Sequence, residues 1–353
     1  MIHIVTVYDS LNYGSYFQAM ALKNYLCKFD NVDYLDIHHQ NLRKDTIRLV
    51  MRNFKHFQFK AAYGVLCKYV VFKNAHKNFA VTNIHNVSEN DIFVFGSDEI
   101  WNLNRDKMRR SKEFFGAGIP GHNKIAYAPS INTTCIDTFR NYDYCKIELD
   151  KFVAISVRDS RSKVVIEELT GREVPLLVDP TLLMEMNFYS KRMSKTKLDY
   201  PFLLIYSYGS LMKISGVQEK IIAFARKERV RIVSLGQNFT FCDSNIMATP
   251  KEFLKYVSMA KYIITDTFHG SIFSIIFQKN FLAYDVSNYK VNALLSDYNL
   301  SNRMVNKDAD LDNKFSHAPD FSDCNLIWNK RKLESEQFIE NAINIIKTEN
   351  TDD

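Results

Sequence analysis

The chain has 353 residues, more than one ordinary domain needs, and its length suggests about two domains. Hydrophobic residues make up 46% and charged residues 24%, a globular composition that excludes a disordered or fibrous protein. The formal net charge of +6 is too small, if evenly spread, to indicate a nucleic-acid-binding protein.

Short apolar runs alternate with helical stretches along the chain, which is typical of parallel α/β sheets. In the first half, strands are predicted at 2–7, 32–37, 91–95, 124–128, 152–156 and 174–178, and helices at 14–28, 42–57, 60–79, 136–149 and 160–170. In the second half, strands are predicted at 202–207, 230–235, 262–265 and 281–284, and helices at 217–227, 250–259, 270–278 and 333–347.

The alternation pauses at 186–200, a stretch with four basic residues that is predicted to be a linker. It separates an amino-terminal parallel-sheet α/β domain at 1–185 from a second such domain at 201–332. A carboxy-terminal helix and tail at 333–353 would return to the first domain. In parallel sheets ligands bind outside the carboxyl ends of strands, so polar residues at strand ends are the candidate site.

No targeting signal is apparent. The first residues, MIHIVTVYDS, lack a basic region and are interrupted by Asp9, so they predict a buried strand rather than a signal peptide. The apolar stretch 262–284 contains an aspartate, a histidine and a lysine, which argues against a membrane span. The six cysteines form no C-x-x-C pair, so reduced thiols in a cytoplasmic protein are expected.

The segment TDTFHGS, at 265–271, joins a predicted strand to a predicted helix. Backbone amides from Gly270 onward would be unpaired in the first helical turn, an arrangement that suits a phosphate or carboxylate. Gly270 would let a substrate approach the backbone closely, and His269 could donate to the anion or move a proton. The alternative is an ordinary helix N-terminus with a satisfied histidine near the surface.

A second strand end carries FGSDEIWN, at 95–102. Asp98 at this place could act as a general base for a sugar hydroxyl. Ser97 and Asp98 also cap helices well, so a helix cap or a tight turn is the alternative.

Two further strand ends carry polar residues. Arg158, in ISVRD, could hold a phosphate or carboxylate with two hydrogen bonds, or it could pair with Asp159 or Asp179. The segment NYGS, at 12–15, opens the first helix and would contact a ligand or simply cap the helix, and Gln18 lies one turn further on.

Other patterns are rejected. The segment 116–121 fits G-x-G-x-x-G, but it follows no predicted strand, contains Pro120 and leads into no helix, which excludes a dinucleotide site. The acidic segment 308–312 lies in a polar loop and is a poor metal site. His38 and His39 are adjacent and would face opposite sides of a strand, so we expect no metal there.

Taken together and in this order, the segments NYGSYFQAMAL, FGSDEIWN, KIAYAPS, ISVRD, VDPTLL and TDTFHGSIFSIIF resemble the polysaccharide pyruvyl transferase family, from about Tyr8 to Arg303. The resemblance implies two Rossmann-like domains with a cleft between them, as in GT-B glycosyltransferases. It implies that the domain at 1–185 binds the acceptor and that the domain at 201–332 binds the donor. It also implies transfer of pyruvate from phosphoenolpyruvate onto two hydroxyls of a sugar, which forms a cyclic ketal.

The resemblance maps the donor-binding arginine and histidine of the family onto Arg158 and His269. There are three departures from the family pattern: Thr267 replaces a serine, Glu99 stands where glutamine is common, and Lys290 stands where an arginine often occurs. Threonine keeps the hydroxyl and lysine keeps the charge.

Motifs and resemblance together give the expected site. Catalysis is assigned to His269 and Asp98, and donor binding to Arg158, Phe268, His269, Gly270 and Ser271. Acceptor binding is assigned to Asn12, Tyr13, Gly14, Ser15, Gln18, Glu99, Trp101 and Asn102. We expect no metal and no cofactor, with phosphoenolpyruvate as co-substrate. The acceptor would be a sugar or lipid-linked oligosaccharide of a bacterial exopolysaccharide or capsule.

Two other functions remain open at this point. One is a GT-B-type glycosyltransferase that uses a sugar nucleotide, and the other is a non-catalytic carbohydrate-binding relative. The sequence leaves the oligomeric state open.

The net charge is concentrated in the segment 41–79, which has nine basic residues and one acidic residue, a net charge of +8, interleaved with apolar side chains. The segment is either a solvated helix face or a surface for an anionic partner. That partner would be a diphosphate-linked acceptor or the inner face of the membrane, which a cytoplasmic protein would contact peripherally. No motif that reads nucleic acid accompanies the charge, so no nucleic-acid partner is expected.

Overall fold

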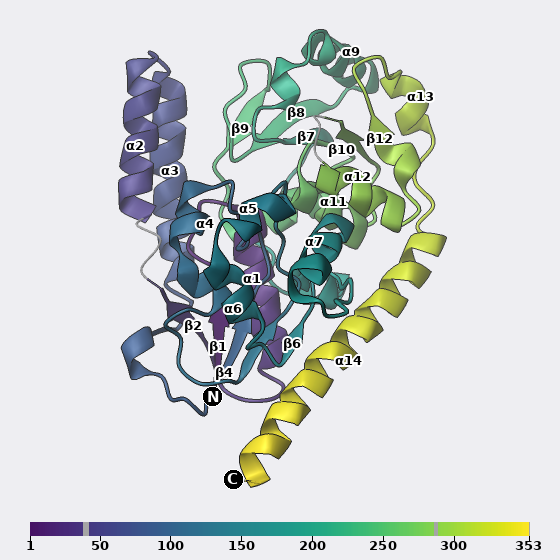
Figure 1. The fold of residues 1–353 in the computed structure, drawn as a ribbon. Helices are drawn as coiled ribbons and strands as arrows, with labels where there is room; N and C mark the ends of the chain where they lie inside the picture. Colours follow the sequence, from purple (N-terminus) through teal and green to yellow (C-terminus); the bar gives the residue numbers. More distant parts are fainter. Residues whose placement is uncertain (38–41, 286–288, 353) are drawn as a thin grey trace. The chain divides into compact units, whose positions relative to one another are not determined.

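The computed structural model describes residues 1–37, 42–285 and 289–352 (Figure 1). Its internal contacts divide the chain into two compact units. The first unit consists of Met1–Asn41, His76–Leu183 and Asn329–Asp353, and the second of Leu42–Ala75 and Met184–Trp328.

The first unit is built on a six-stranded parallel sheet with the order β3-β2-β1-β4-β5-β6. Both central strands are buried along their whole length, as expected when helices cover both faces of a parallel sheet. Ile4 of β1 is in register with Tyr34 of β2 on one side and Val94 of β4 on the other. The strands are β1 (Ile2–Val5), β2 (Val32–Asp36), β3 (Val81–Asn83), β4 (Ile92–Phe95), β5 (Lys124–Ala126) and β6 (Ala154–Ile155).

Polar caps start the main helices of the first unit. The Asn12 side chain accepts a hydrogen bond from the Gly14 amide at the start of α1, and Asp159 does the same for the Ser162 amide in α7. The helices are α1 (Tyr13–Leu26), η1 (Ile84–Asn86), α4 (Asp106–Arg110), η2 (Lys112–Phe115), α5 (Ile136–Arg140), α6 (Asp143–Leu149), α7 (Ser160–Thr170) and η3 (Pro180–Leu183).

The second unit contains another six-stranded parallel sheet, with the order β12-β11-β10-β7-β8-β9. Counted along its own segment of chain, this is the same strand order as in the first unit. The strand order reverses between β1 and β4 in one sheet and between β7 and β10 in the other, where α/β sheets bind ligands. The strands are β7 (Phe202–Tyr206), β8 (Arg231–Leu235), β9 (Ser244–Ile246), β10 (Tyr262–Thr265), β11 (Phe281–Tyr284) and β12 (Met304–Val305).

Helices of the second unit include α10, which starts with a complete capping box between Thr249 and Glu252 and has Pro250 in its first turn. The helices are α2 (Leu42–Lys55), α3 (Phe59–His76), α8 (Met186–Ser190), η4 (Leu211–Lys213), α9 (Val217–Glu228), α10 (Pro250–Met259), α11 (Phe268–Ile276), α12 (Tyr289–Asp297), η5 (Ser301–Arg303) and α13 (Leu311–Ser316). The long helix α14 (Ser322–Asp352) begins in this unit and continues into the first, where the Ser335 hydroxyl accepts a hydrogen bond from the Val178 amide.

The placement of α2 and α3 differs from the predicted domain division, in which both helices belong to the first domain. Residues Leu42–Ala75, which form α2 and nearly all of α3, belong to the second unit. The Lys68 Nζ donates to the Gly236 carbonyl at 3.3 Å, and the Asn238 side chain donates to the Lys60 carbonyl at 2.8 Å. These bonds connect positions far apart in the chain, which periodicity along the sequence does not indicate.

Several local predictions also differ from the structure. The predicted strand at 174–178 forms only an isolated bridge between Val157 and Leu176, and the predicted helix at 136–149 is two short helices. The strands β3, β9 and β12 were not predicted, since two or three residues carry too little pattern. Across the described residues, none of the helices combines the length and apolar character needed to cross a bilayer. All six cysteines are free thiols.

Candidate active site

A sharp turn after β4 places Asp98 at the carboxyl edge of the first sheet. Gly96 has a φ of 120°, and a Cβ there would lie 2.2 Å from the Tyr127 carbonyl oxygen, so only glycine fits. Asp98 itself has a φ of 67°, a left-handed conformation that aspartate adopts more readily than most residues. Asp98 therefore follows the carboxyl end of a strand, as the sequence predicted, and the structure shows that the strand order reverses at this edge.

The Asp98 carboxylate is held by three groups. Its Oδ2 accepts a hydrogen bond from the Ser15 hydroxyl at 2.6 Å, and its Oδ1 accepts one from the Glu99 amide at 2.9 Å. The same Oδ1 lies 3.5 Å from the Arg158 guanidinium. The Asp98 side chain keeps 17% of its surface exposed, so it is oriented by the protein and still open to a substrate. A carboxylate in this position can take a proton from a hydroxyl group.

Arg158 is buried in an ion pair with Asp179. Its Nη1 donates to the Asp179 Oδ2 at 2.7 Å and to the Ser97 hydroxyl at 3.4 Å, and only 2% of its side chain is exposed. Burial acts to lower the pKa of Arg158, but the carboxylates of Asp179 and Asp98 together raise it above its ordinary value. The pairing with Asp179 is one of the alternatives that the sequence left open, and the sequence assigned Asp179 no role of its own.

Gln18, predicted to contact the acceptor, is fully buried and connects the loops after β1 and β4. Its amide group donates to the Thr6 hydroxyl at 3.1 Å, and its carbonyl oxygen accepts from the Ser97 amide at 3.2 Å. This placement makes Gln18 a residue that positions the two loops instead of one that contacts a ligand.

The start of α1 contains the other predicted acceptor residues. Asn12 is half-buried and caps the helix through the Gly14 amide at 2.8 Å, while Tyr13 is fully buried. Of this group, Ser15 reaches the candidate site, through its bond to Asp98.

Glu99 and Asn102 form a second polar cluster beside Asp98. The Glu99 Oε2 accepts hydrogen bonds from Asn102 at 3.0 Å and Asn132 at 2.8 Å, and it forms an ion pair with Arg105 at 3.3 Å. Asn102 is buried, whereas Glu99 is half-buried. These contacts shape the loop after β4 and leave the Glu99 carboxylate largely engaged by the protein.

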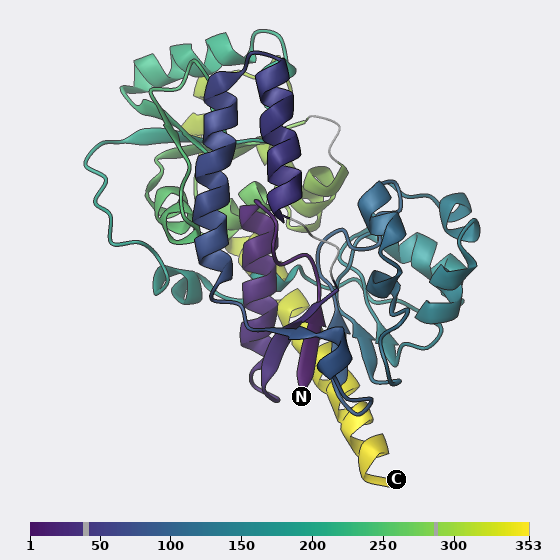
Figure 2. The same cartoon turned by 90° about the vertical axis from the view of Figure 1, so that its left-hand side faces the viewer.

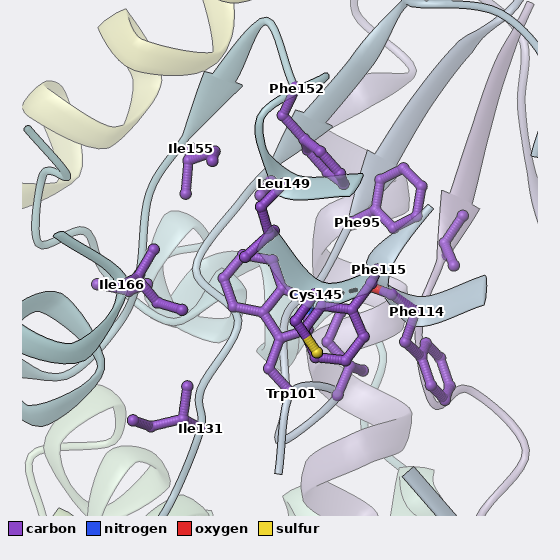
Figure 3. Close-up of a cluster of buried hydrophobic side chains, with 14 of the residues drawn as sticks. Phe95, Trp101, Phe114, Phe115, Ile131, Cys145, Leu149, Phe152, Ile155 and Ile166 are labelled. Carbon is purple, nitrogen blue, oxygen red and sulfur yellow. Dashed lines mark hydrogen bonds between the residues drawn. The ribbon is translucent and has the colours of Figure 1, made fainter. Parts of the chain in front are cut away.

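The prediction that Trp101 contacts the acceptor is wrong. Its indole is fully buried in the hydrophobic core of the first unit, where it stacks on Phe115 at 5.9 Å between ring centres (Figure 3). Its Nε1 donates to the Phe114 carbonyl at 2.9 Å, which satisfies the one polar atom of the ring. Sequence proximity to Asp98 suggested the site, whereas the large apolar surface of the ring decides its position.

At the carboxyl edge of the second sheet, Asp266 follows β10 and holds the loop after β7. Its Oδ2 accepts hydrogen bonds from the Ser207 hydroxyl at 2.7 Å and the Leu211 amide at 2.9 Å. The two sheets therefore share an arrangement. An aspartate just beyond β4 or β10 accepts a hydrogen bond from a serine that follows β1 or β7 in the chain. Asp266 is not among the predicted site residues, although its position directly after a predicted strand is a signal of this kind.

The first turn of α11 is closed by its own cap. The Thr267 hydroxyl accepts a hydrogen bond from the Gly270 amide at 3.0 Å, and the Thr267 carbonyl accepts from the Ser271 amide at 3.1 Å. Ser271 is fully buried, and its hydroxyl also bonds the Thr267 carbonyl. The expectation that amides from Gly270 onward are available to an anion is therefore wrong for these two residues.

Gly270 is explained by packing inside the protein. A Cβ at this position would lie 2.2 Å from the Thr265 Oγ1 and 2.6 Å from the Thr267 Oγ1. The sequence predicted that a substrate approaches Gly270 closely, whereas the groups that crowd this position in the structure are two threonine hydroxyls.

We expect Gly270→Ala to lower the free energy of unfolding by about 1–3 kcal/mol, because the added methyl overpacks the start of α11. Urea denaturation of the two proteins would measure the difference. Thr265→Ala removes the nearest atom, so Gly270→Ala should cost less in that background. Equal costs in both backgrounds would contradict this explanation.

His269 lies near the carboxyl edge of the second sheet, as predicted, but it belongs to the first turn of α11, which begins two residues earlier than expected. It is mostly buried, and its ring meets the half-buried Phe268 ring edge-on at 5.3 Å between centres. Lys290, in the first turn of α12, is also mostly buried.

The described ranges contain no group of three or more histidine, cysteine or acidic residues that could hold a metal ion. In the acidic segment 308–312, Asp310 caps α13 and Asp312 pairs with Lys227 at 2.7 Å, so both have structural partners. His38 and His39 lie outside the described residues. The absence of a metal or cofactor stays a prediction.

Comparisons with known proteins address the fold and the family. Trehalose-6-phosphate synthase OtsA is 8% identical with a TM-score of 0.51, over 98% of this chain and 99% of that one. UDP-GlcNAc 2-epimerase from Neisseria meningitidis, bound to UDP-GlcNAc, is 8% identical with a TM-score of 0.51, over 97% and 99%. Together with the two parallel sheets, these similarities give the chain the GT-B-like α/β fold that the sequence predicted.

No curated protein matches the sequence significantly. The model of the polysaccharide pyruvyl transferase family matches residues 12–288, which is most of the chain. The resemblance seen in the motifs is thereby confirmed: the chain belongs to the polysaccharide pyruvyl transferase family and is a transferase of polysaccharide biosynthesis.

Proposed function

We propose that the protein transfers the pyruvyl group of phosphoenolpyruvate onto two hydroxyls of a sugar in a polysaccharide or a lipid-linked glycan precursor. Membership of the family supports pyruvyl transfer to a sugar. The observation that carries the chemistry is the Asp98 carboxylate, which Ser15 and Arg158 orient at the strand-order reversal of the first sheet while part of it stays exposed.

The reaction balances without any further reactant. Protonation of the methylene carbon makes C2 of the enolpyruvate electrophilic, and one sugar hydroxyl adds to C2. The C2–O bond to phosphate then breaks, and the second hydroxyl closes the ketal. Of the two hydroxyl protons, one ends on the new methyl group and the other on inorganic phosphate. The chemistry needs a base for the hydroxyls and an acid for the carbon.

Within this proposal, Asp98 is the base for a sugar hydroxyl, and His269 acts on the donor as proton donor or phosphate partner. Arg158 becomes a positioning residue. Its near-complete burial and its pair with Asp179 support a role in orienting Asp98 over direct binding of phosphoenolpyruvate.

The proposal is tested by supplying phosphoenolpyruvate with a panel of lipid-linked sugars. We expect phosphate release that depends on the acceptor, together with a mass gain of one pyruvyl ketal on the product. Phosphoenolpyruvate should also raise the melting temperature of the protein, whereas sugar nucleotides should not. Consumption of a sugar nucleotide, with no use of phosphoenolpyruvate across the panel, would overturn the proposal.

The role of His269 has its own measurement in the same assay. His269→Ala should release phosphate far more slowly than wild type, since a proton-transfer group contributes about 10²–10⁴-fold in rate. Turnover near that of wild type would remove His269 from the mechanism and leave the assignment of the reaction standing.

A further inference from the structure

We propose that the helical hairpin formed by α2 and α3 docks the protein on an anionic lipid surface. The two helices are joined by a short turn and lie side by side in both views (Figures 1 and 2). The inference rests on the exposed face of this hairpin, and it does not depend on the proposed chemistry.

The hairpin exposes an apolar stripe along each helix. The exposed residues follow one another at intervals of three and four positions, which places them on one face of each helix. Each of them has between 44% and 70% of its surface exposed. They are Ile47, Met51 and Phe54 in α2, and Phe59, Tyr63, Leu66 and Val70 in α3.

The pattern of α2 is the reverse of an ordinary surface helix. The side chains that it buries include the polar Thr46 and Asn53, while Ile47, Met51 and Phe54 face outward. A surface helix of a globular protein normally buries its apolar face. An outward apolar face of this extent is typical of a surface that another partner covers.

An aromatic cluster forms the turn between the two helices. Phe59 meets Phe54 edge-on at 5.5 Å and Phe57 at 6.3 Å between ring centres. Phe57 is 81% exposed, the most exposed of the large apolar residues described. Exposed phenylalanine rings at a turn between two basic helices suit insertion at the boundary between lipid headgroups and acyl chains.

Basic side chains accompany the apolar stripes. Eight of the nine basic residues of the segment 41–79 are exposed, and the ninth, Lys68, is buried against the Gly236 carbonyl. Near an anionic membrane each exposed lysine or arginine contributes about 1 kcal/mol of attraction. The exposed ones in the hairpin are Arg43, Lys44, Arg48, Arg52, Lys55, Lys60 and Lys73, and Lys77 directly follows α3.

The apolar stripes and the basic side chains together favour a lipid surface over other binding partners. A second copy of the chain would bring another segment of charge +8 against the first, which opposes self-association through this face. An apolar stripe flanked by arginine and lysine matches what an anionic bilayer offers, hydrocarbon beneath negative headgroups. Neither α2 nor α3 is apolar enough to span a bilayer, so the hairpin would lie on the surface.

Flotation of the whole protein with vesicles tests the proposal. At low salt, we expect co-flotation with vesicles made of equal amounts of phosphatidylcholine and phosphatidylglycerol, and far less with phosphatidylcholine alone. The double variant Met51→Ser, Phe57→Ser should partition about tenfold more weakly or worse, because it removes exposed apolar surface that the lipid would bury. The matched control is Val164→Ser, Leu326→Ser, two apolar residues outside the hairpin that are 63% and 70% exposed, and it should leave flotation unchanged.

Absence of flotation with anionic vesicles at low salt would overturn the proposal, as would equal flotation of the Met51, Phe57 variant. Sedimentation that shows a dimer lost in this variant would assign the face to a second copy instead. The variant should still release phosphate from phosphoenolpyruvate with an acceptor that carries no lipid. This control separates failure of docking from failure of the proposed pyruvyl transfer.

Discussion

Replacing Asp98 by Asn should lower the rate of pyruvyl transfer by about 10²–10⁴-fold, the range expected when a general base is lost. The amide is close in size to the carboxylate and can still accept a hydrogen bond from Ser15 at 2.6 Å, so the loop should keep its conformation. What disappears is the ability to accept a proton from the sugar hydroxyl. Steady-state phosphate release at saturating phosphoenolpyruvate would measure the change.

Two companion variants make this result specific. Ser15→Ala removes one hydrogen bond to Asp98, which is worth about 1 kcal/mol, and should slow the reaction by only about fivefold. Asp137→Asn makes the same chemical change at an exposed carboxylate in α5, which pairs with Arg140, and should leave the rate unchanged. If Asp98→Asn turned over like Asp137→Asn, Asp98 would not be the base.

The position of Asp98 could be predicted because apolar runs mark the strands and parallel strands end at one edge of a sheet. The directions in which the neighbouring side chains point could not be predicted. Trp101 lies three residues from Asp98 and turns into the core, and Gln18 lies one turn from Ser15 and bonds to backbone. Which side of a loop faces a ligand depends on packing partners such as Phe115, which the sequence does not indicate.

The strand order that the two sheets share also could not be predicted from the sequence. Two parallel sheets could be predicted from the alternation of strands and helices, but strand order depends on long-range pairing. The pairing of β1 with β4, for example, skips two intervening strands. The two sheets share topology without a repeat of sequence, so the correspondence between Asp98 and Asp266 emerges only when both sheet edges are known.

A buried ion pair gives the second large effect. Arg158→Ala should lower the free energy of unfolding by about 3–5 kcal/mol, because it leaves Asp179 buried without the guanidinium that balances its charge. It should also lower the rate of pyruvyl transfer, since Asp98 loses a group that orients its Oδ1. Urea denaturation and phosphate release, measured on the same preparation, give the two effects separately.

The double variant Arg158→Met, Asp179→Leu distinguishes a stabilising pair from a positioning one. Replacing both partners of a buried pair by apolar side chains is often neutral for stability, so part of the lost unfolding free energy should return. The return should be incomplete, because Asp179→Leu also removes the acceptor of the buried Thr181 amide and hydroxyl. Activity should stay low, because the Asp98 Oδ1 then lacks the Arg158 guanidinium that lies 3.5 Å from it. Arg158→Lys keeps a charge near Asp179 and should restore part of the rate. Recovery of full activity in the Met, Leu variant would show that Arg158 serves the fold alone and that Asp98 is oriented by Ser15 and the Glu99 amide.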